Sequence, residues 1–525
     1  MSQRPLFYPF QGGLDLTSPA LAVPKGRVIG CQNHESVSQG YARIEGFERY
    51  DGRLSPTEAF RLAATPEEAA TDREAARAAI GPVPGSGPVR GVATFNGTRY
   101  AWRDNLAGTV GVLHKATEDG WEPVWAMFPA GGRYYTVNHN FYGATNLKRL
   151  YGCNGVGKAF EFDGDTTLTF IDTGMASDTP NRIAAFKQHL FLSFPGGSVQ
   201  HSETGVPTAF SAVLGAGEIA VGADVTDFAT SVNALHIFTT DSINNLLGSD
   251  ATDWVMEPLT DEEGTGALAH TVQKLATPLY MDVGGLRSIA ATTAYGNFKI
   301  GSLIDQISPI IEAKRTIGVK PIASVVVKDK GQYRLFFEDG TGFSVFFGRK
   351  YAEPMLFDLG KKVTCISSAE DPEAGSRMFF GSDDGYVYEL DAGTSFDGGE
   401  IEAFLQLPYD PSGSPWQLKR WHKIILELRA KPNTEIGMTA EFDYSDGDQR
   451  TLPTQSFAVN GGGGLWDLAN WDQFFWSAAV EGRAECYLDG QGSNMSLVIV
   501  SRSAEQEAYV LSGITMMISG RGQKR

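Results

Sequence analysis

Two stretches far apart in the chain follow the same pattern of residue types. LYGCNGVGKAFEFDG spans residues 150–164, and FFGSDDGYVYELDAG spans residues 379–393. Each begins with an apolar pair and a glycine, passes through a polar turn, and ends in an alternating segment followed by Asp and Gly. Alternation with period two places one face of a strand in a core, and a turn such as Asp384-Gly385 supplies the positive φ of a hairpin. The pattern predicts a repeated strand–turn–strand unit.

Five looser relatives of this unit lie elsewhere in the chain, and they turn at Asn96-Gly97, Lys187 to His189, Thr240-Asp241, Gly284-Gly285 and Asp339-Gly340. The seven turns are about 35 to 60 residues apart. A period of this size, made of hairpins, is typical of β-propeller blades. It also assigns Asp383 and Asp384 to a turn. The alternative is a calcium loop, but the Asp-x-Asp-x-Asp-Gly spacing of such loops is absent from this stretch.

The whole chain is therefore predicted to be all-β, with residues 1–35 as an N-terminal arm and residues 36–400 as a propeller of six or seven blades. Propellers usually close by pairing an N-terminal strand with the last blade, and SQGYARIEGFERYDG (38–52) contains a suitable strand near residues 41–47. Residues 401–525 contain longer alternating segments and predict an antiparallel β-sandwich. A tryptophan-rich stretch, GGGGLWDLANWDQFFW (461–476), fills a core or an interface in one interpretation and stacks sugars in another.

One segment, residues 55–88, is alanine-rich and predicts a helical insertion. It carries two capping boxes, one beginning at Ser55 and one at Thr65, each with Pro at the first helical position. Gly81 and Pro82 end the second helix. The insertion is either a surface decoration or a contact arm for a neighbouring subunit.

The sequence lacks the catalytic and nucleotide-binding motifs of common enzyme classes. There is no P-loop, Rossmann fingerprint, H-E-x-x-H or G-x-S-x-G, and the eight histidines, including His34, His201 and His422, are scattered. We therefore expect no catalytic, cofactor-binding or metal-binding residues, no cofactor, and no enzyme activity. The four cysteines are widely spaced and predict free thiols. No apolar run is long enough to span a membrane, and the N-terminus is too polar for a secretory leader.

The net charge is 44 − 62 = −18. Phosphate binding depends on Lys and Arg, so an acidic chain is a poor non-specific binder of nucleic acid. It is still suited to let DNA pass without holding it. The simpler interpretation is that the charge serves solubility alone.

Three regions resemble structural proteins of short bacteriophage tails. The first is the segment 9–52, which we call the N-terminal phrase. Its resemblance rests on Gly13, Leu14, Asp15, Ser18, Pro19, Gly26, Asn33, Gly40, Tyr41, Arg43, Gly46 and Gly52. VQHSETGVPTAFSA (199–212) is similar to a recurrent blade segment of that family, and residues 490–525 are similar to its last strands and basic tail. The helical insertion has no counterpart in the family pattern.

This resemblance implies a tail nozzle or hub protein, of the type also called a DNA-stabilisation or tail tubular protein. Such a virion protein forms a ring, expected to be a hexamer, below the portal and adaptor, and it is assembled in the host cytoplasm. It continues the channel for double-stranded DNA, helps to retain the genome until DNA ejection, and anchors tail fibres or a needle. The candidate assembly or channel contacts are Arg521, Lys524 and Arg525, in a C-terminal tail that brakes DNA, docks a neighbouring protein or is simply solvated.

The alternative function is that of a propeller glycosidase or polysaccharide depolymerase, with the sandwich as its carbohydrate-binding module. It requires a pair of carboxylates facing each other across a sugar, and a deep acidic pocket at the centre of the propeller. A third interpretation, an intracellular interaction propeller, predicts regular Gly-His and Trp-Asp repeat signatures, which these irregular blades lack.

Overall fold

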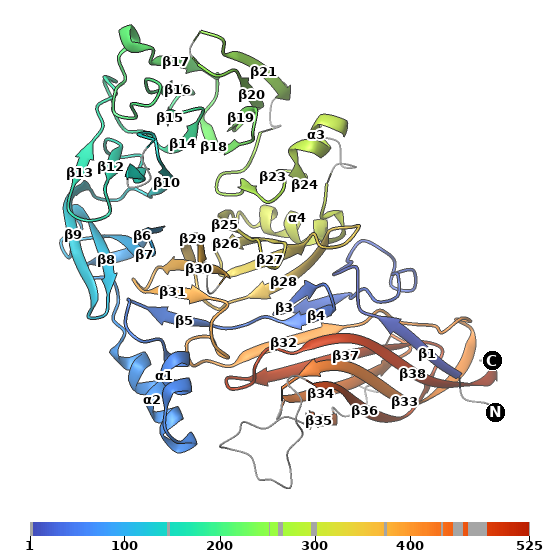
Figure 1. Cartoon of the computed structure of the whole chain (residues 1–525). Coiled ribbons are helices and arrows are strands. Elements are labelled where there is room, and N and C mark those ends of the chain that lie inside the picture. The colour runs from blue at the N-terminus through green and yellow to red at the C-terminus, as the bar shows by residue number, and fades with distance from the viewer. Residues whose placement is uncertain are drawn as a thin grey trace.

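The chain folds into seven small sheets arranged around an axis and two larger sheets that pack against one side of that ring (Figure 1). The computed structural model describes residues 4–523 apart from 144–146, 251, 261–265, 296–301, 372–374, 432–433, 445–454 and 460–479. The tryptophan-rich stretch at 461–476 thus lies outside the described residues. No helix in the described part is long and apolar enough to cross a membrane.

The first four blades are consecutive four-stranded antiparallel meanders. They comprise β6 (Ser86–Phe95), β7 (Thr98–Asp104), β8 (Val110–Thr117) and β9 (Gly120–Pro129); β10 (Tyr135–His139), β11 (Arg149–Cys153), β12 (Phe160–Phe162) and β13 (Leu168–Phe170); β14 (Arg182–Phe186), β15 (His189–Phe194), β16 (Ser198–His201) and β17 (Gly217–Ala220); and β18 (Val225–Thr230), β19 (Ala234–Thr239), β20 (Ile243–Leu247) and β21 (Val255–Thr260).

The last three blades differ more from one another. The fifth has three described strands and is followed by helices; its elements are β22 (Gln273–Lys274), β23 (Pro278–Asp282), β24 (Gly285–Ser288), α3 (Ile289–Tyr295), η4 (Asp305–Ile307) and α4 (Ser308–Thr316). The sixth contains β25 (Pro321–Val327), β26 (Gln332–Phe337), β27 (Thr341–Phe346) and β28 (Glu353–Asp358). The seventh contains β29 (Val363–Asp371), β30 (Gly375–Ser382), β31 (Val387–Leu390) and β5 (Phe47–Tyr50).

Each of the seven predicted turns lies in a different blade, so the predicted propeller is confirmed and has seven blades. Asn96 and Gly97, for example, join β6 to β7 with φ values of 48° and 79°. A two-residue hairpin needs positive φ at both central positions to match the twist of its strands. Asp384 is likewise a turn residue, and its Oδ1 accepts a hydrogen bond from the Tyr386 amide at 3.0 Å.

The ring closes as predicted by pairing an N-terminal strand with the last blade. β5 pairs antiparallel with β31, with Phe47 opposite Leu390 and Tyr50 opposite Val387. The closing strand lies at the C-terminal end of the predicted stretch, because residues 40–43 pair elsewhere. The first strand of each blade contacts the first strand of the next, and β29 packs against both β25 and β6, so these strands surround the axis.

The other two sheets form the predicted antiparallel sandwich, but both ends of the chain build it. One sheet has the order β3-β4-β38-β33-β36, with β1 also on β38; the other has the order β2-β32-β37-β34-β35. Their strands are β1 (Arg4–Pro9), β2 (Gly30–Gln32), β3 (His34–Val37), β4 (Gly40–Arg43), β32 (Ile401–Gln406), β33 (Gln417–Ala430), β34 (Thr434–Phe442), β35 (Gln455–Val459), β36 (Val480–Gly492), β37 (Met495–Ser503) and β38 (Val510–Gln523).

This arrangement corrects the predicted domain boundaries. Residues 1–35 are not a separate arm, because β1, β2 and β3 belong to the sandwich. The propeller begins at β5 rather than at residue 36, since β4 also pairs with β38. The expected closing strand in 38–52 predicted a boundary at residue 36, whereas hydrogen bonding of β4 to β38 places these residues in the sandwich.

The helical insertion forms as predicted and lies beside β5, at the edge of the molecule (Figure 1). It contains α1 (Pro56–Leu62) and α2 (Pro66–Ala79). The Ser55 and Thr65 hydroxyls accept hydrogen bonds from the amides of Glu58 at 3.2 Å and Glu68 at 3.3 Å. The insertion ends earlier than residue 88, because β6 begins at Ser86.

Candidate functional site

The candidate contact residues at the C-terminus lie at the end of a sandwich strand. The backbone of Arg521 belongs to β38, which pairs with β33 as far as Gln523 opposite Gln417. Arg521 is therefore not part of a free tail. Lys524 and Arg525 lie outside the described residues, so their role as contacts stays a prediction.

Several residues of the N-terminal phrase lie where it contacts the C-terminal strands or the propeller. Several are glycines at which another backbone passes too close for a side chain. A Cβ at Gly40 would lie 2.0 Å from the Leu511 carbonyl oxygen, and one at Gly46 would lie 2.1 Å from that of Ser395. Gly40 also has a φ of 144°, which side-chain-bearing residues rarely adopt. Glycine is therefore required at these positions of the N-terminal phrase, because another backbone segment lies against each of them.

Asn33 of the same phrase links the two regions directly, and Tyr41 holds the N-terminal segment together. Asn33, with φ 55°, donates through Nδ2 to the Glu402 carbonyl at 2.7 Å and accepts at Oδ1 from the Asp358 amide at 2.8 Å. It thereby links β32 of the sandwich to β28 of the sixth blade. The Tyr41 hydroxyl donates to the Gly26 carbonyl at 2.7 Å and accepts from the Gly13 amide at 3.0 Å.

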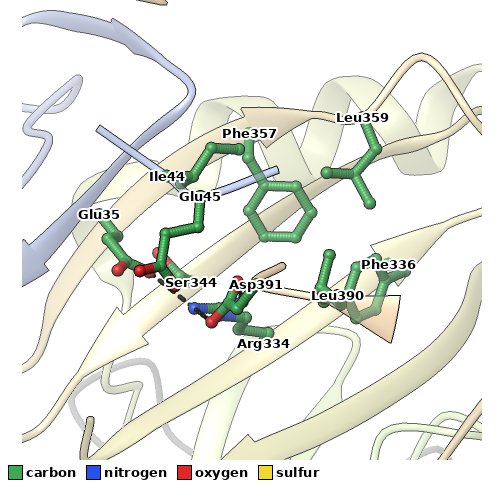
Figure 2. Close-up of a pocket in the computed structure, with 10 residues that line it drawn as sticks. All are labelled: Glu35, Ile44, Glu45, Arg334, Phe336, Ser344, Phe357, Leu359, Leu390 and Asp391. Atoms are coloured by element: carbon green, nitrogen blue, oxygen red, sulfur yellow. Dashed lines mark hydrogen bonds and ion pairs between the residues drawn. The ribbon is translucent and has the colours of Figure 1, made fainter. Parts of the chain in front are cut away.

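A cluster of five charged side chains lies at this joint, and four of its members share a small pocket with apolar walls (Figure 2). We call Glu35, Glu45, Lys330, Arg334 and Asp391 the charged joint. Arg334 lies 2.7 Å from both Glu35 and Asp391, and Lys330 lies 2.9 Å from Glu35, 2.8 Å from Asp391 and 3.5 Å from Glu45. These residues come from β3, from the segment before β5, from the sixth blade and from the end of β31.

The pairing inside the charged joint shifts its pKa values strongly. Burial raises the pKa of the Asp391 carboxyl, but the charges of Arg334 and Lys330 outweigh burial and hold that pKa well below its usual range. Burial likewise lowers the pKa of Lys330, and the charges of Asp391 and Glu35 reverse the effect. At Glu45, burial prevails and raises the pKa. On acidification, Glu45 therefore takes up a proton before Asp391 does.

Sequence reasoning missed the charged joint, although one signal was present. Arg334 is a cation inside β26, whose residues are all buried. A charge in such a run requires a partner, because an isolated buried charge is strongly unfavourable. The partners Glu35 and Asp391 are distant in sequence, so the pattern alone does not identify them.

At the centre of the propeller lies a cavity of about 360 Å³, lined by residues from all seven inner strands or the segments directly before them. Its charged side chains are Arg133, Arg182 and Asp227, and His270 also lines it. Among the described lining residues, Asp227 is thus the single carboxylate. This lining therefore does not form the acidic central pocket that the glycosidase alternative requires.

The histidines and cysteines singled out in the sequence have structural partners or are buried. His34 lies within hydrogen-bonding distance of the Gln32 carbonyl (3.0 Å) and the Tyr509 hydroxyl (3.3 Å), and His422 lies 2.7 Å from the Ser519 hydroxyl. His201 is buried and lies against the Trp254 ring. All four cysteines are buried thiols. Among the described residues, no group of three or more His, Cys, Asp or Glu side chains is placed to hold a metal ion.

Comparison with known proteins finds structural similarity only at low sequence identity. No family model and no curated protein matches the chain. It is similar to the structure of YCF48 bound to D1 peptide, with 10% identity and a TM-score of 0.38 over 59% of this chain and 95% of that one. It is also similar to the computationally designed Ika8 protein, with 10% identity and a TM-score of 0.34 over 59% and 98%. The third similar structure is Raptor of Chaetomium thermophilum, with 8% identity and a TM-score of 0.39 over 60% of this chain and 28% of that one.

None of these three proteins is a phage tail protein. Similarity at this level carries no argument about function. The architecture therefore rests on the sheet order and strand pairing of the chain itself, which make it a seven-bladed β-propeller joined to a β-sandwich.

Proposed function

We propose that the chain is a structural protein of a short phage tail, a nozzle or hub subunit that assembles into a ring below the portal and adaptor. The ring continues the DNA channel, helps to retain the packaged genome and anchors fibres or a needle. The proposal begins from the resemblance of the N-terminal phrase, the blade segment and the C-terminal strands to that family.

One observation supports it most directly: the N-terminal phrase forms the joint that holds propeller and sandwich together. Asn33 bridges β32 and β28, and the charged joint connects β3 to the sixth and seventh blades. A continuous apolar core also runs from the sandwich into the fifth and sixth blades. A subunit whose two parts are joined rigidly is suited to a ring that withstands the pressure of a packaged genome.

The surface of the helical insertion supports an assembly role for it. On and beside α1, three large apolar side chains are exposed: Leu54 at 47%, Phe60 at 46% and Leu62 at 64%. Exposed apolar side chains on an insertion can be covered by a neighbouring subunit. The insertion is anchored to the seventh blade, because the Thr57 hydroxyl donates to Glu48 at 2.6 Å.

Electron microscopy of the purified full chain, alone and with candidate virion proteins, tests the proposal. We expect closed rings of six subunits with an open axis, either spontaneously or on addition of the adaptor. A chain that stays monomeric with every tail partner would contradict the proposal. So would hydrolysis of a polysaccharide that is lost on mutating one carboxylate, because it would establish the glycosidase alternative instead.

A pair of matched variants tests the contact arm. Leu62→Ser removes an exposed apolar side chain on α1, whereas Leu106→Ser removes one that is 85% exposed on the first blade. Both should fold normally, since neither side chain is buried. We expect only Leu62→Ser to weaken ring assembly; equal assembly of the two variants would make the insertion a decoration.

A further inference from the structure

The central cavity of the propeller has one charged wall and one neutral wall. The charged residues come from the second, third and fourth blades: Arg133 lies just before β10, Arg182 is the first residue of β14, and Asp227 lies in β18. His270, just before β22, continues this wall into the fifth blade. All four lie at or near the starts of inner strands, so they share one end of the cavity.

The two guanidinium groups converge on one aromatic ring. The Cζ of Arg182 lies 4.2 Å, and that of Arg133 lies 5.6 Å, from the centroid of Tyr135. The Tyr135 hydroxyl lies 2.8 Å from Nδ1 of His270, which fixes the ring in the wall. Arg182 is held by donation from Nε to the Thr226 carbonyl at 2.5 Å and from Nη1 to the Asn181 carbonyl at 2.7 Å.

The charges at this end of the cavity do not cancel. Asp227 supplies one negative charge against two guanidiniums, and its Oδ1 also accepts the Phe228 amide at 2.9 Å. Burial, together with the charges of Arg133 and Arg182, lowers the pKa of His270 to about 2, so its imidazole is neutral near pH 7. The wall therefore keeps a net positive charge within a protein whose net charge is −18.

The facing wall leaves space and offers neutral hydrogen-bonding groups. It is formed by the sixth and seventh blades with small side chains such as Ala323, Ser324 and Ser367. Thr136 and Gln273 add a hydroxyl and an amide to the cavity lining. A cavity of about 360 Å³ is in the size range of small-molecule sites, which combine a few fixed polar groups with room for the ligand body.

We propose that this cavity binds a small anion that carries hydroxyl groups, a sugar acid or a polyol phosphate, with its carboxylate or phosphate held between Arg133 and Arg182. Planar guanidiniums bind both groups through paired N–H donors. The hydroxyl groups of the ligand then contact the neutral wall. This function is independent of ring assembly and goes beyond a role as a structural subunit.

Isothermal titration calorimetry of the full chain tests the site with glucuronate, glycerol phosphate and neutral glucose. We expect saturable binding of at least one anion with a Kd below about 1 mM, and none of glucose at the same concentration. Glucuronate alone would identify a carboxylate site, and glycerol phosphate alone a phosphate site. No binding of either anion at about 10 mM, or equal binding of glucose, would overturn the proposal.

Three variants separate binding from folding. Arg133→Gln should weaken anion binding about tenfold, whereas the control Arg149→Gln, in β11 of the same blade, should leave it unchanged. Asp227→Asn should strengthen binding, because it removes a carboxylate whose negative charge opposes that of a bound anion. A damaged fold cannot strengthen binding, so the opposite signs are diagnostic. Equal affinities for Arg133→Gln and Arg149→Gln would overturn the proposal, as would weaker binding by Asp227→Asn.

Discussion

The propeller and the sandwich are both antiparallel β structures, but they are built from the chain in opposite ways. Six of the seven blades use strands that are consecutive in the chain, as in β6 to β9. The sandwich pairs the two ends of the chain, with Ala42 opposite Val510 and Cys31 opposite Leu405. Closing a long loop costs conformational entropy, so non-local pairing requires specific stabilising contacts. The glycines and buried charges of the joint supply them.

The seventh blade combines both modes. Its strands β29 to β31 are consecutive, but its outer strand β5 comes from the N-terminal segment. The same segment contributes β1 to β4 to the sandwich. Residues 4–50 therefore serve both regions, which makes them the most informative place to disturb.

The largest expected effect is that of N-terminal deletion. Removing residues 1–50 takes away β1 to β5, exposes unpaired edges in both regions, and should abolish soluble folding. Removing residues 1–43 spares β5 and should leave a closed propeller that resists proteolysis while the sandwich is digested. Limited proteolysis with mass spectrometry distinguishes the two. If residues 1–43 prove dispensable for the sandwich as well, the contrast between the regions is wrong.

Next in size is the loss of a buried cation at the charged joint. Arg334→Met leaves Glu35 and Asp391 without their main partner and should lower the free energy of unfolding by about 3–5 kcal/mol. The control is Arg377→Met, which breaks a pair with Glu389 inside the seventh blade; Arg377 is 29% exposed there, so the loss should be about 1 kcal/mol or less. Chemical denaturation measures both. Similar losses of unfolding free energy in the two variants would show that the buried cation of the charged joint stabilises the protein no more than an ion pair within a blade does.

A smaller contrast separates a glycine of the sandwich from a hairpin glycine of the propeller. Gly40→Ala places a Cβ 2.0 Å from the Leu511 oxygen at φ 144° and should cost roughly 2–4 kcal/mol. At Gly97, φ is 79° but nothing lies within 4 Å, so Gly97→Ala should cost roughly 1 kcal/mol. Thermal unfolding of the two variants checks the order. A cost for Gly97→Ala as large as that for Gly40→Ala would refute the steric argument.

Near neutral pH, the smallest effect is that of two buried histidines. Burial lowers the pKa of His34, in the sandwich, and that of His114, in the first blade, to about 4 each. The unfolded chain takes up these protons near pH 6.5, so each histidine reduces stability as pH falls from 6.5 towards 4, by about 1.4 kcal/mol per pH unit. His34→Gln and His114→Gln should each flatten that decline in unfolding measurements. If the two variants affect separate unfolding transitions, the sandwich and the propeller unfold independently. If both variants affect the same unfolding transition, the joint couples the two regions.

Several features of the fold could be predicted because their determinants are local. The turn at Asn96-Gly97 needs two residues that tolerate positive φ, and the caps at Ser55 and Thr65 need a hydroxyl next to a helix start; both signals lie within a few residues. The charged joint and the arginine pair of the cavity could not be predicted in this way. Arg334 and Glu35 are far apart in the chain, as are Arg133 and Asp227, and only the closed ring brings each pair together.

Local sequence patterns are enough to predict the repeating hairpins, the all-β class, the helical insertion and the position of each blade, because strand periodicity and turn conformation depend on neighbouring residues. Tertiary structure decided the rest. It assigned residues 4–43 to the sandwich, placed Glu35, Arg334 and Asp391 in one buried cluster, and turned seven inner strands into the wall of one cavity. The physical reason is that burial and charge pairing depend on distance in space, which local pattern does not specify.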